Sequence, residues 1–170
     1  MVRSKPLILI MACLAAGLMG FFFFYQTDAE KIRSRLDELA ERVSKDESEN
    51  ELMAAGHAKN IAEIFTDPCV LKIPQTPYRD VSGEFSRQDI RAYAMSGRAR
   101  YERIELAIYD ISIDFPDENT ASVRLTARIN AGAQDSKRQF DEFYELACKF
   151  KKIEGDWLIN RVAAVEVLER

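Results

Sequence analysis

The sequence is poor in the residue types that build catalytic and metal centres. Its 170 residues contain one histidine, His57, and three cysteines, Cys13, Cys69 and Cys148, with no CxxC pair among them. Structural zinc sites take four such ligands, usually with paired short spacings. The sequence also lacks a phosphate-binding glycine loop and a nucleophile beside a general base. We therefore predict no metal, no cofactor and no catalytic residues, and favour a protein that is not an enzyme.

Positive charge is scarce outside the extreme N-terminus. Arg3 and Lys5 precede a long apolar run, which leaves 22 basic residues in the rest of the chain against all 28 acidic residues. A domain with this balance has an overall field that repels phosphate backbones, so we predict no binding to nucleic acid. The length and the apolar fraction of 47% leave room for one domain and an appendage.

The N-terminus carries an uncharged stretch, residues 6–25, which reads PLILIMACLAAGLMGFFFFY. At a rise of about 1.5 Å per residue it matches a hydrocarbon core of about 30 Å. We predict a transmembrane helix at 6–25 behind a cytoplasmic tail at 1–5, because Arg3 and Lys5 favour the cytoplasmic side. The protein would then be a single-pass inner-membrane protein with its C-terminal domain on the extracytoplasmic side.

Two alternatives to this membrane anchor fit less well. A cleaved signal peptide needs a small-residue cleavage site, which the residues after Phe24 do not offer. Residues 10–13, Ile-Met-Ala-Cys, resemble a lipoprotein box, but Met11 is a poor fit there.

Residues 26–50 are rich in charge and carry a narrow apolar stripe. The stripe has helical spacing and consists of Ile32, Leu36, Leu39 and Val43. We predict a stalk helix outside the domain. Its stripe is either the seam of a short coiled coil or the side of a solvated helix that rests on the domain.

Residues 51–170 alternate between helical and strand patterns. The alternation of apolar and polar residues slips near Tyr109 and Asp110, which predicts a β-bulge. Gly155 supplies the positive φ of a tight hairpin turn. We predict helices at 51–65 and 86–97, a short strand at 69–73, and a loop at 75–85 with room for a short strand around Val81. Long strands are predicted at 101–115, 121–130 and on both sides of the turn at 154–156.

Two passages within this order, 65–70 (FTDPCV) and 150–159 (FKKIEGDWLI), resemble the nuclear transport factor two-like (SnoaL-like) superfamily. The resemblance implies an α+β domain in which a curved antiparallel sheet wraps around helices, with the Cys69 strand beside the last strand. A cystatin-like or other helix-on-sheet fold has the same elements. In the implied strand order one strand separates Cys69 from Cys148, so we predict two buried free thiols.

Members of that superfamily include small enzymes with a carboxylate or a His/Asp pair in an apolar cavity. The corresponding candidates here are His57, Tyr93 and Asp110, which we single out as possible ligand-binding residues. His57 has helical spacing from Ile61 and Ile64, and Asp110 sits at the expected bulge. The simpler interpretations are a histidine at a helix edge, an aromatic core residue and a solvated bulge residue.

Six arginines gather in the loop and helix before the long strands: Arg79, Arg87, Arg91, Arg98, Arg100 and Arg103. They would suit anionic headgroups or an acidic partner. Acidic residues are interleaved with them, which is typical of an ordinary solvated surface.

The anchor, the stalk and the missing catalytic set together favour an interaction or assembly module of a bacterial-type cell envelope. Its partner would be a second copy or another envelope protein. In layout this resembles the bitopic components of type IV secretion systems. The alternative is a domain that binds a small apolar ligand, or turns one over as an isomerase or cyclase does.

Overall fold

The computed structural model describes residues 27–76, 79–132 and 140–165. The chain divides into two compact units, residues 1–31 and 32–170, and the architecture below is that of the second. Its helices are α2 (Asp28–Val43), which belongs to this unit from Ile32 onward, α3 (Glu51–Glu63) and α4 (Arg87–Arg100). Its strands are β1 (Phe65–Thr76), β2 (Arg79–Phe85), β3 (Arg103–Asp117), β4 (Thr120–Gly132), β5 (Phe140–Ile153) and β6 (Asp156–Ala164).

The predicted cytoplasmic tail, transmembrane helix and lipoprotein-like box lie within residues 1–26, outside the described residues. In the described segments, no helix combines the length and the apolar character needed to cross a membrane.

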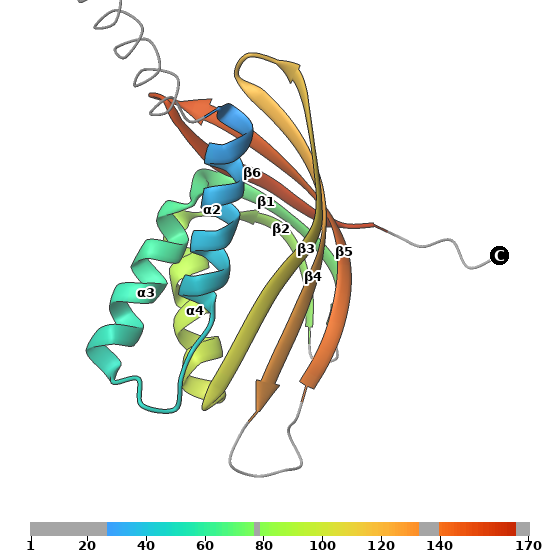
Figure 1. The fold of residues 1–170 in the computed structure, drawn as a ribbon. Helices are drawn as coiled ribbons and strands as arrows, with labels where there is room; N and C mark the ends of the chain where they lie inside the picture. Colours follow the sequence, from blue (N-terminus) through green and yellow to red (C-terminus); the bar gives the residue numbers. More distant parts are fainter. Residues whose placement is uncertain (1–26, 77–78, 133–139, 166–170) are drawn as a thin grey trace, which may run out of the picture. The chain divides into compact units, whose positions relative to one another are not determined.

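The six strands form one curved sheet in the order β2-β1-β6-β5-β4-β3, with the helices on one face (Figure 1). All neighbouring strands are antiparallel except β1 and β6, which run parallel. The prediction of an α+β domain with the Cys69 strand beside the last strand is confirmed. One strand is longer than expected: in the segment predicted as a loop with room for a short strand around Val81, residues 79–85 form β2. It lies at the edge of the sheet, where the glycine that suggested a loop, Gly83, is tolerated.

Helix α2 contributes to the hydrophobic core of the domain. Ile32 and Leu36 are 0% and 1% exposed, in one cluster with Phe150 and Trp157, and Leu39 and Val43 pack against that cluster. The sequence placed this helix in a stalk, with the domain beginning at residue 51. The structure differs because the stripe faces the sheet, so the domain includes residues from 32 onward. Helical periodicity identifies an apolar face but not what covers it.

The local irregularities follow the sequence. Glu154 and Gly155 both have positive φ, 53° and 93°, so β5 and β6 are joined by a two-residue turn of the kind that hairpins prefer. In β3 the register shifts between Tyr109 and Ser112, and Asp110 has φ 53°. The expected bulge is therefore present. Helix α4 begins with a reciprocal capping box between Ser86 and Asp89, as the Ser-x-x-Asp spacing predicts.

Cys69 on β1 and Cys148 on β5 are both buried and free, and β6 lies between their strands. The prediction of two buried free thiols is confirmed. Burial raises the pKa of Cys69 to about 11. Burial, with a smaller effect of Cys69, raises the pKa of Cys148 to about 12. Both side chains are therefore thiols at neutral pH and act as small apolar core residues.

Candidate functional site

The three predicted ligand-binding residues lie in different parts of the fold. Tyr93 is 42% exposed on α4, and its ring packs edge-on against Phe85 of β2 at 5.5 Å. Asp110 is exposed at the bulge of β3 and accepts a 3.4 Å hydrogen bond from the Thr126 hydroxyl. His57 lies on α3, with its Nε2 3.8 Å from Oε1 of Glu49. Tyr93 thus contacts β2, Asp110 contacts β4, and His57 contacts the segment before α3.

The environment of His57 centres on a buried ion pair that the sequence did not reveal. The Arg98 and Glu49 side chains are 3% and 5% exposed. The Arg98 guanidinium donates from Nε to Glu49 Oε2 at 2.9 Å and pairs through Nη2 with Oε1. Arg98 is therefore buried. The charged residues near it in the sequence had instead suggested that it belongs to a solvated surface.

Arg98 also caps the C-terminus of α2. Its Nη1 donates to the carbonyl oxygens of Arg42 (2.6 Å) and Val43 (3.2 Å), and its Nη2 donates to that of Ser44 (3.0 Å). The last carbonyls of a helix have no partner within the helix, so a buried helix end needs such donors. One side chain of α4 thus fixes both the end of α2 and the carboxylate of Glu49.

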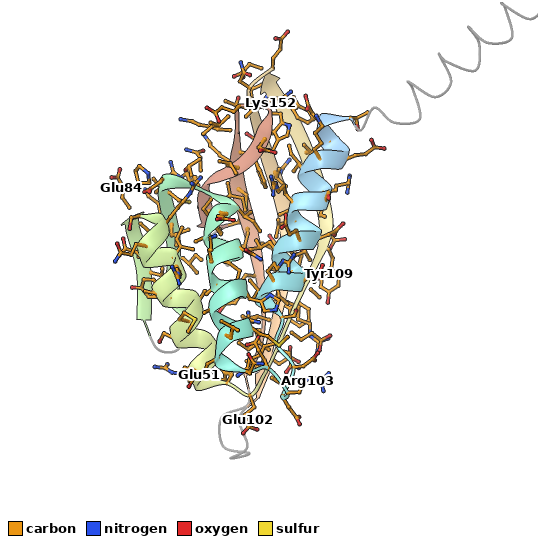
Figure 2. All side chains as sticks on the ribbon, turned by 90° about the vertical axis from the view of Figure 1, so that its left-hand side faces the viewer. Glu51, Glu84, Glu102, Arg103, Tyr109 and Lys152 are labelled. Carbon is orange, nitrogen blue, oxygen red and sulfur yellow. The ribbon has the colours of Figure 1, made fainter. Side chains whose placement is uncertain are left out.

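Lys45 makes the reciprocal contact. Its Nζ donates to the carbonyl oxygens of Arg98 and Tyr101, both at 2.7 Å, and so caps the end of α4. The Lys45 backbone also pairs with Ile104 of β3. Figure 2 shows the labelled Glu51, Glu102 and Arg103 at this end of the domain. The segment between α2 and α3 is therefore tied to both α4 and β3.

A cavity of about 300 Å³ opens beside this ion pair. It is bounded by the end of α2, the segment before α3 and the first half of α3; its wall includes Glu41, Lys45, Asp46, Glu49, Met53 and His57. The His57 Nδ1 atom is buried and has no hydrogen-bond partner in the described structure. A buried nitrogen without a partner is uncommon in folded proteins and marks this imidazole for attention.

The carboxyl group of Glu49 is held in its ionised form. Burial by itself would raise the pKa of Glu49, but the hydrogen bonds and charge of Arg98, helped by His57 and Lys45, hold the pKa below the usual 4.5. The group therefore stabilises the folded state above the pKa of the unfolded chain. This stability is lost as the pH falls through the lower pKa of the folded state.

We expect the free energy of unfolding of Glu49→Gln to fall less steeply below pH 4.5 than that of the wild type. At pH 6.5 the variant should be the less stable protein, because Arg98 loses its charged partner. Urea unfolding at pH 6.5, 4.5 and 3.5 measures both effects. Glu118→Gln, in the exposed turn between β3 and β4, should follow the wild-type curve. Parallel curves of unfolding free energy against pH for Glu49→Gln and the wild type would contradict the role of Glu49 as the ionised partner of Arg98.

A second polar pair lies on β5. Glu142 and Tyr144 are opposite Ile129 and Ala127 of β4, and thus on the helix-facing side of the sheet. The Tyr144 hydroxyl donates to the Glu142 carboxylate. Burial, then this contact, raises the pKa of Tyr144. Glu142 is not among the residues predicted from the sequence. It could have been recognised there, because it is an acidic residue on the same face of the alternating strand as Cys148.

The outer face of the sheet is defined here as the face of β3, β4 and β5 away from the helices (Figure 1). It carries exposed aromatic side chains. Tyr109 is 40% exposed and Phe143 is 64% exposed. Between them Arg128 pairs with both carboxylate oxygens of Asp141, each at 2.8 Å, and lies 5.5 Å from the centre of the Phe143 ring. The arginine is therefore held in place while its aromatic neighbours stay open to contact.

Comparisons with known proteins give no match by sequence, either to a protein-family model or to a curated protein. Solved structures match well in shape. A candidate calcium/calmodulin-dependent protein kinase II association domain from Xanthomonas campestris superposes with a TM-score of 0.60 at 15% identity, over 85% of this chain and 91% of its own. A candidate scytalone dehydratase from Novosphingobium aromaticivorans gives 0.59 at 14% identity, over 83% and 85%.

A third structure, from the same organism, is a nuclear transport factor two-like protein with a cystatin-like fold. It matches with a TM-score of 0.58 at 13% identity, over 92% of this chain and 90% of its own. Identities this low are evidence for the fold and for nothing finer. The domain has the α+β, cystatin-like fold of nuclear transport factor two-like proteins, a curved sheet with its helices on one face.

Proposed function

We propose that the domain is a self-association module, which pairs with a second copy of the chain through the outer face of its sheet. The observation that carries the proposal is the pair of exposed aromatic rings, Tyr109 and Phe143, on either side of Arg128. Tyrosine, phenylalanine and arginine are the residue types enriched in protein interfaces. Both rings stand on long, paired strands, so their positions are fixed before any partner binds.

The charges of the outer face favour a second copy over a partner of one sign. The outer face carries both signs of charge: Arg128 of β4 pairs with Asp141 of β5, and Glu145 and Lys149 lie further along β5 on the same face. A two-fold axis through such a surface brings each patch onto its own counterpart, with opposite charges able to meet. If residues 6–25 anchor the chain in a membrane, as the sequence predicts, copies would also be concentrated in one plane.

Native mass spectrometry of the full chain in a mild non-ionic detergent tests the proposal. We expect a dimer for the wild type, and at least tenfold weaker dimerisation for Phe143→Glu combined with Tyr109→Glu, because the new carboxylates would be buried against each other. The matched control is Leu52→Glu, which changes a side chain 85% exposed on α3 and should leave the dimer intact. A monomeric wild type, or a dimer unaffected by the double variant, would refute the proposal.

A second candidate function rests on the Glu142 and Tyr144 pair. A carboxylate and a phenol on the helix-facing side of the sheet are suited to holding a small ligand by hydrogen bonds. One of the structurally similar proteins is described as a candidate dehydratase, so this fold accommodates small-molecule chemistry. The same mass spectra distinguish the functions: a monomer that carries a defined extra mass, lost in Glu142→Gln, would favour ligand binding.

A further inference from the structure

The edge of the sheet formed by β3 carries an open stretch of main chain. In the part of the chain that the structure describes, β3 is the last strand of the sheet and has β4 as its one strand neighbour. The first residues of β3 are covered on the other side, where Ile104 exchanges two main-chain hydrogen bonds with Lys45, of 2.7 and 3.1 Å. The Leu106 N–H donates to the Ser44 hydroxyl at 3.1 Å. Beyond Leu106 the described residues supply no further hydrogen bond across this edge.

The bulge at Asp110 decides which residues of β3 face the open edge. Before the bulge these are the even-numbered residues, as the hydrogen bonds of Ile104 show. The bulge adds one residue to β3, so beyond it the odd-numbered residues, including Ile113 and Phe115, direct their N–H and C=O groups outward. Unpaired main-chain groups of this kind can bind an added strand.

The open stretch is short and has two different faces. It runs over residues 111–115 and ends at Pro116, whose missing N–H is tolerated in an edge strand. The side chains of Ile111 and Ile113 face inward and pack against the hydrophobic core. The Asp114 side chain is exposed on the other face. A strand added here would place alternate side chains beside the apolar core and beside the Asp114 carboxylate.

The charge along β3 and its turn is negative throughout. Residues 104–123 contain no basic residue and five acidic ones: Glu105, Asp110, Asp114, Asp117 and Glu118. Within the described segments none of the five forms an ion pair within 4.0 Å. Hydrogen bonds from the Thr120 hydroxyl and the Asn119 N–H hold the pKa of Asp117 below its usual value, so this carboxylate is ionised. Basic side chains on an added strand are therefore favoured, whereas a second copy of β3 would bring the same charges together.

We propose that the open edge of β3, at residues 111–115, binds an extended segment of a partner protein in which basic and apolar residues alternate. The main chain of Ile113 and Phe115 would pair with this segment. Its apolar side chains would extend the inward face of Ile111 and Ile113, and its basic side chains would lie beside Asp114. The proposal goes beyond self-association and does not rest on it, because it uses the main chain of the edge and not the rings of the outer face.

Amide hydrogen exchange of the full chain in non-ionic detergent tests the proposal. The probe is a peptide of about seven residues in which lysine and valine alternate, which at about 3.4 Å per residue covers the open stretch. In the protein without peptide we expect fast exchange at Ile113 and Phe115, and slow exchange at Ser112 and Asp114, which lie opposite residues of β4. Saturating peptide should slow exchange at Ile113 and Phe115 about tenfold or more.

Two controls separate main-chain pairing from attraction by charge. The same peptide with every amide N-methylated keeps its charge and loses its donors, so it should bind about tenfold more weakly. The variant Asp110→Asn with Asp114→Asn should bind the unmodified peptide about fivefold more weakly. Asparagine tolerates the positive φ of 53° at position 110. Glu51→Gln with Glu63→Gln, which removes two exposed carboxylates from α3, should bind as the wild type does.

Three results would overturn the proposal. The first is slow exchange at Ile113 and Phe115 in the protein without peptide, which would mean that the edge is already paired. The second is exchange at these two amides that stays fast when the peptide is present. The third is equal affinity for the N-methylated peptide, or equal affinity in the Asp110→Asn, Asp114→Asn variant when slow exchange at Ser112 reports an intact strand.

Discussion

Arg98→Met is expected to lower the free energy of unfolding by about 3–5 kcal/mol, the usual cost of removing one partner of a buried ion pair. The substitution keeps most of the apolar length of the side chain but removes every donor. Glu49 is then left as a buried carboxylate without its partner, and the carbonyls of Arg42, Val43 and Ser44 lose theirs. Since the free energy of unfolding of an average domain is about 5–15 kcal/mol, the loss is large.

The control for this prediction is on the same helix. Arg100→Met changes an exposed arginine two residues away and should alter stability by less than about 0.5 kcal/mol. A double-mutant cycle isolates the ion pair, because Arg98→Met with Glu49→Met removes both charges. We expect the double variant to be less destabilised than the sum of its single variants. Urea unfolding monitored by the fluorescence of Trp157 measures all four proteins, and additive effects would contradict the pairing.

Phe150→Ala is expected to cost about 3–5 kcal/mol, the usual range for removing a fully buried aromatic ring. Phe150 is 0% exposed and lies in the core with Ile32, Leu36 and Trp157. The truncation leaves a cavity where the sheet meets α2. The neighbouring side chains stand on long strands and a packed helix, so they can collapse into this cavity only in part. The loss of stability therefore includes both the transfer free energy of the ring and its lost van der Waals contacts.

Phe143→Ala is the matched comparison, since Phe143 lies on the same strand with its side chain on the opposite face. Its ring is 64% exposed. Removing it should cost the isolated domain less than about 1 kcal/mol, mostly through the lost contact with Arg128. It should also weaken self-association. The measurement is urea unfolding at a protein concentration below the dimerisation midpoint. Similar losses in unfolding free energy for Phe150→Ala and Phe143→Ala would mean that the two faces of β5 are wrongly assigned.

The candidate sites show what sequence reasoning could reach. His57 was identified because it is the single histidine, and the structure places it at the wall of a cavity. Its partners were not foreseen, since Glu49 lay in a run of polar residues and Arg98 in a group of arginines. Arg100 and Arg98 look alike in sequence, yet the second is 3% exposed because it alone of these two reaches the end of α2.

The outer face of the sheet shows a similar limit of prediction from the sequence. Aromatic side chains in strands are usually covered, so the sequence pattern by itself favours a buried position for Tyr109. The bulge at Asp110 changes which β3 residues face the helices, and it leaves Tyr109 on the open side. A one-residue slip reverses the face of every side chain beyond it. The bulge was visible in the sequence. Whether Tyr109 faces the helices or the open side depended on which half of the strand the helices cover.

The sequence by itself determined the features that depend on neighbours in the chain. These are the alternation of β4 and β5, the turn at Glu154 and Gly155, the capping box at Ser86 and the bulge in β3. Each is set by backbone conformation or by contacts within a few residues. Only the tertiary structure decided that α2 belongs to the core, that residues 79–85 form an edge strand and that Arg98 is buried with Glu49. These depend on which surfaces meet across long separations in sequence, and periodicity shows that a surface is apolar without showing what it packs against.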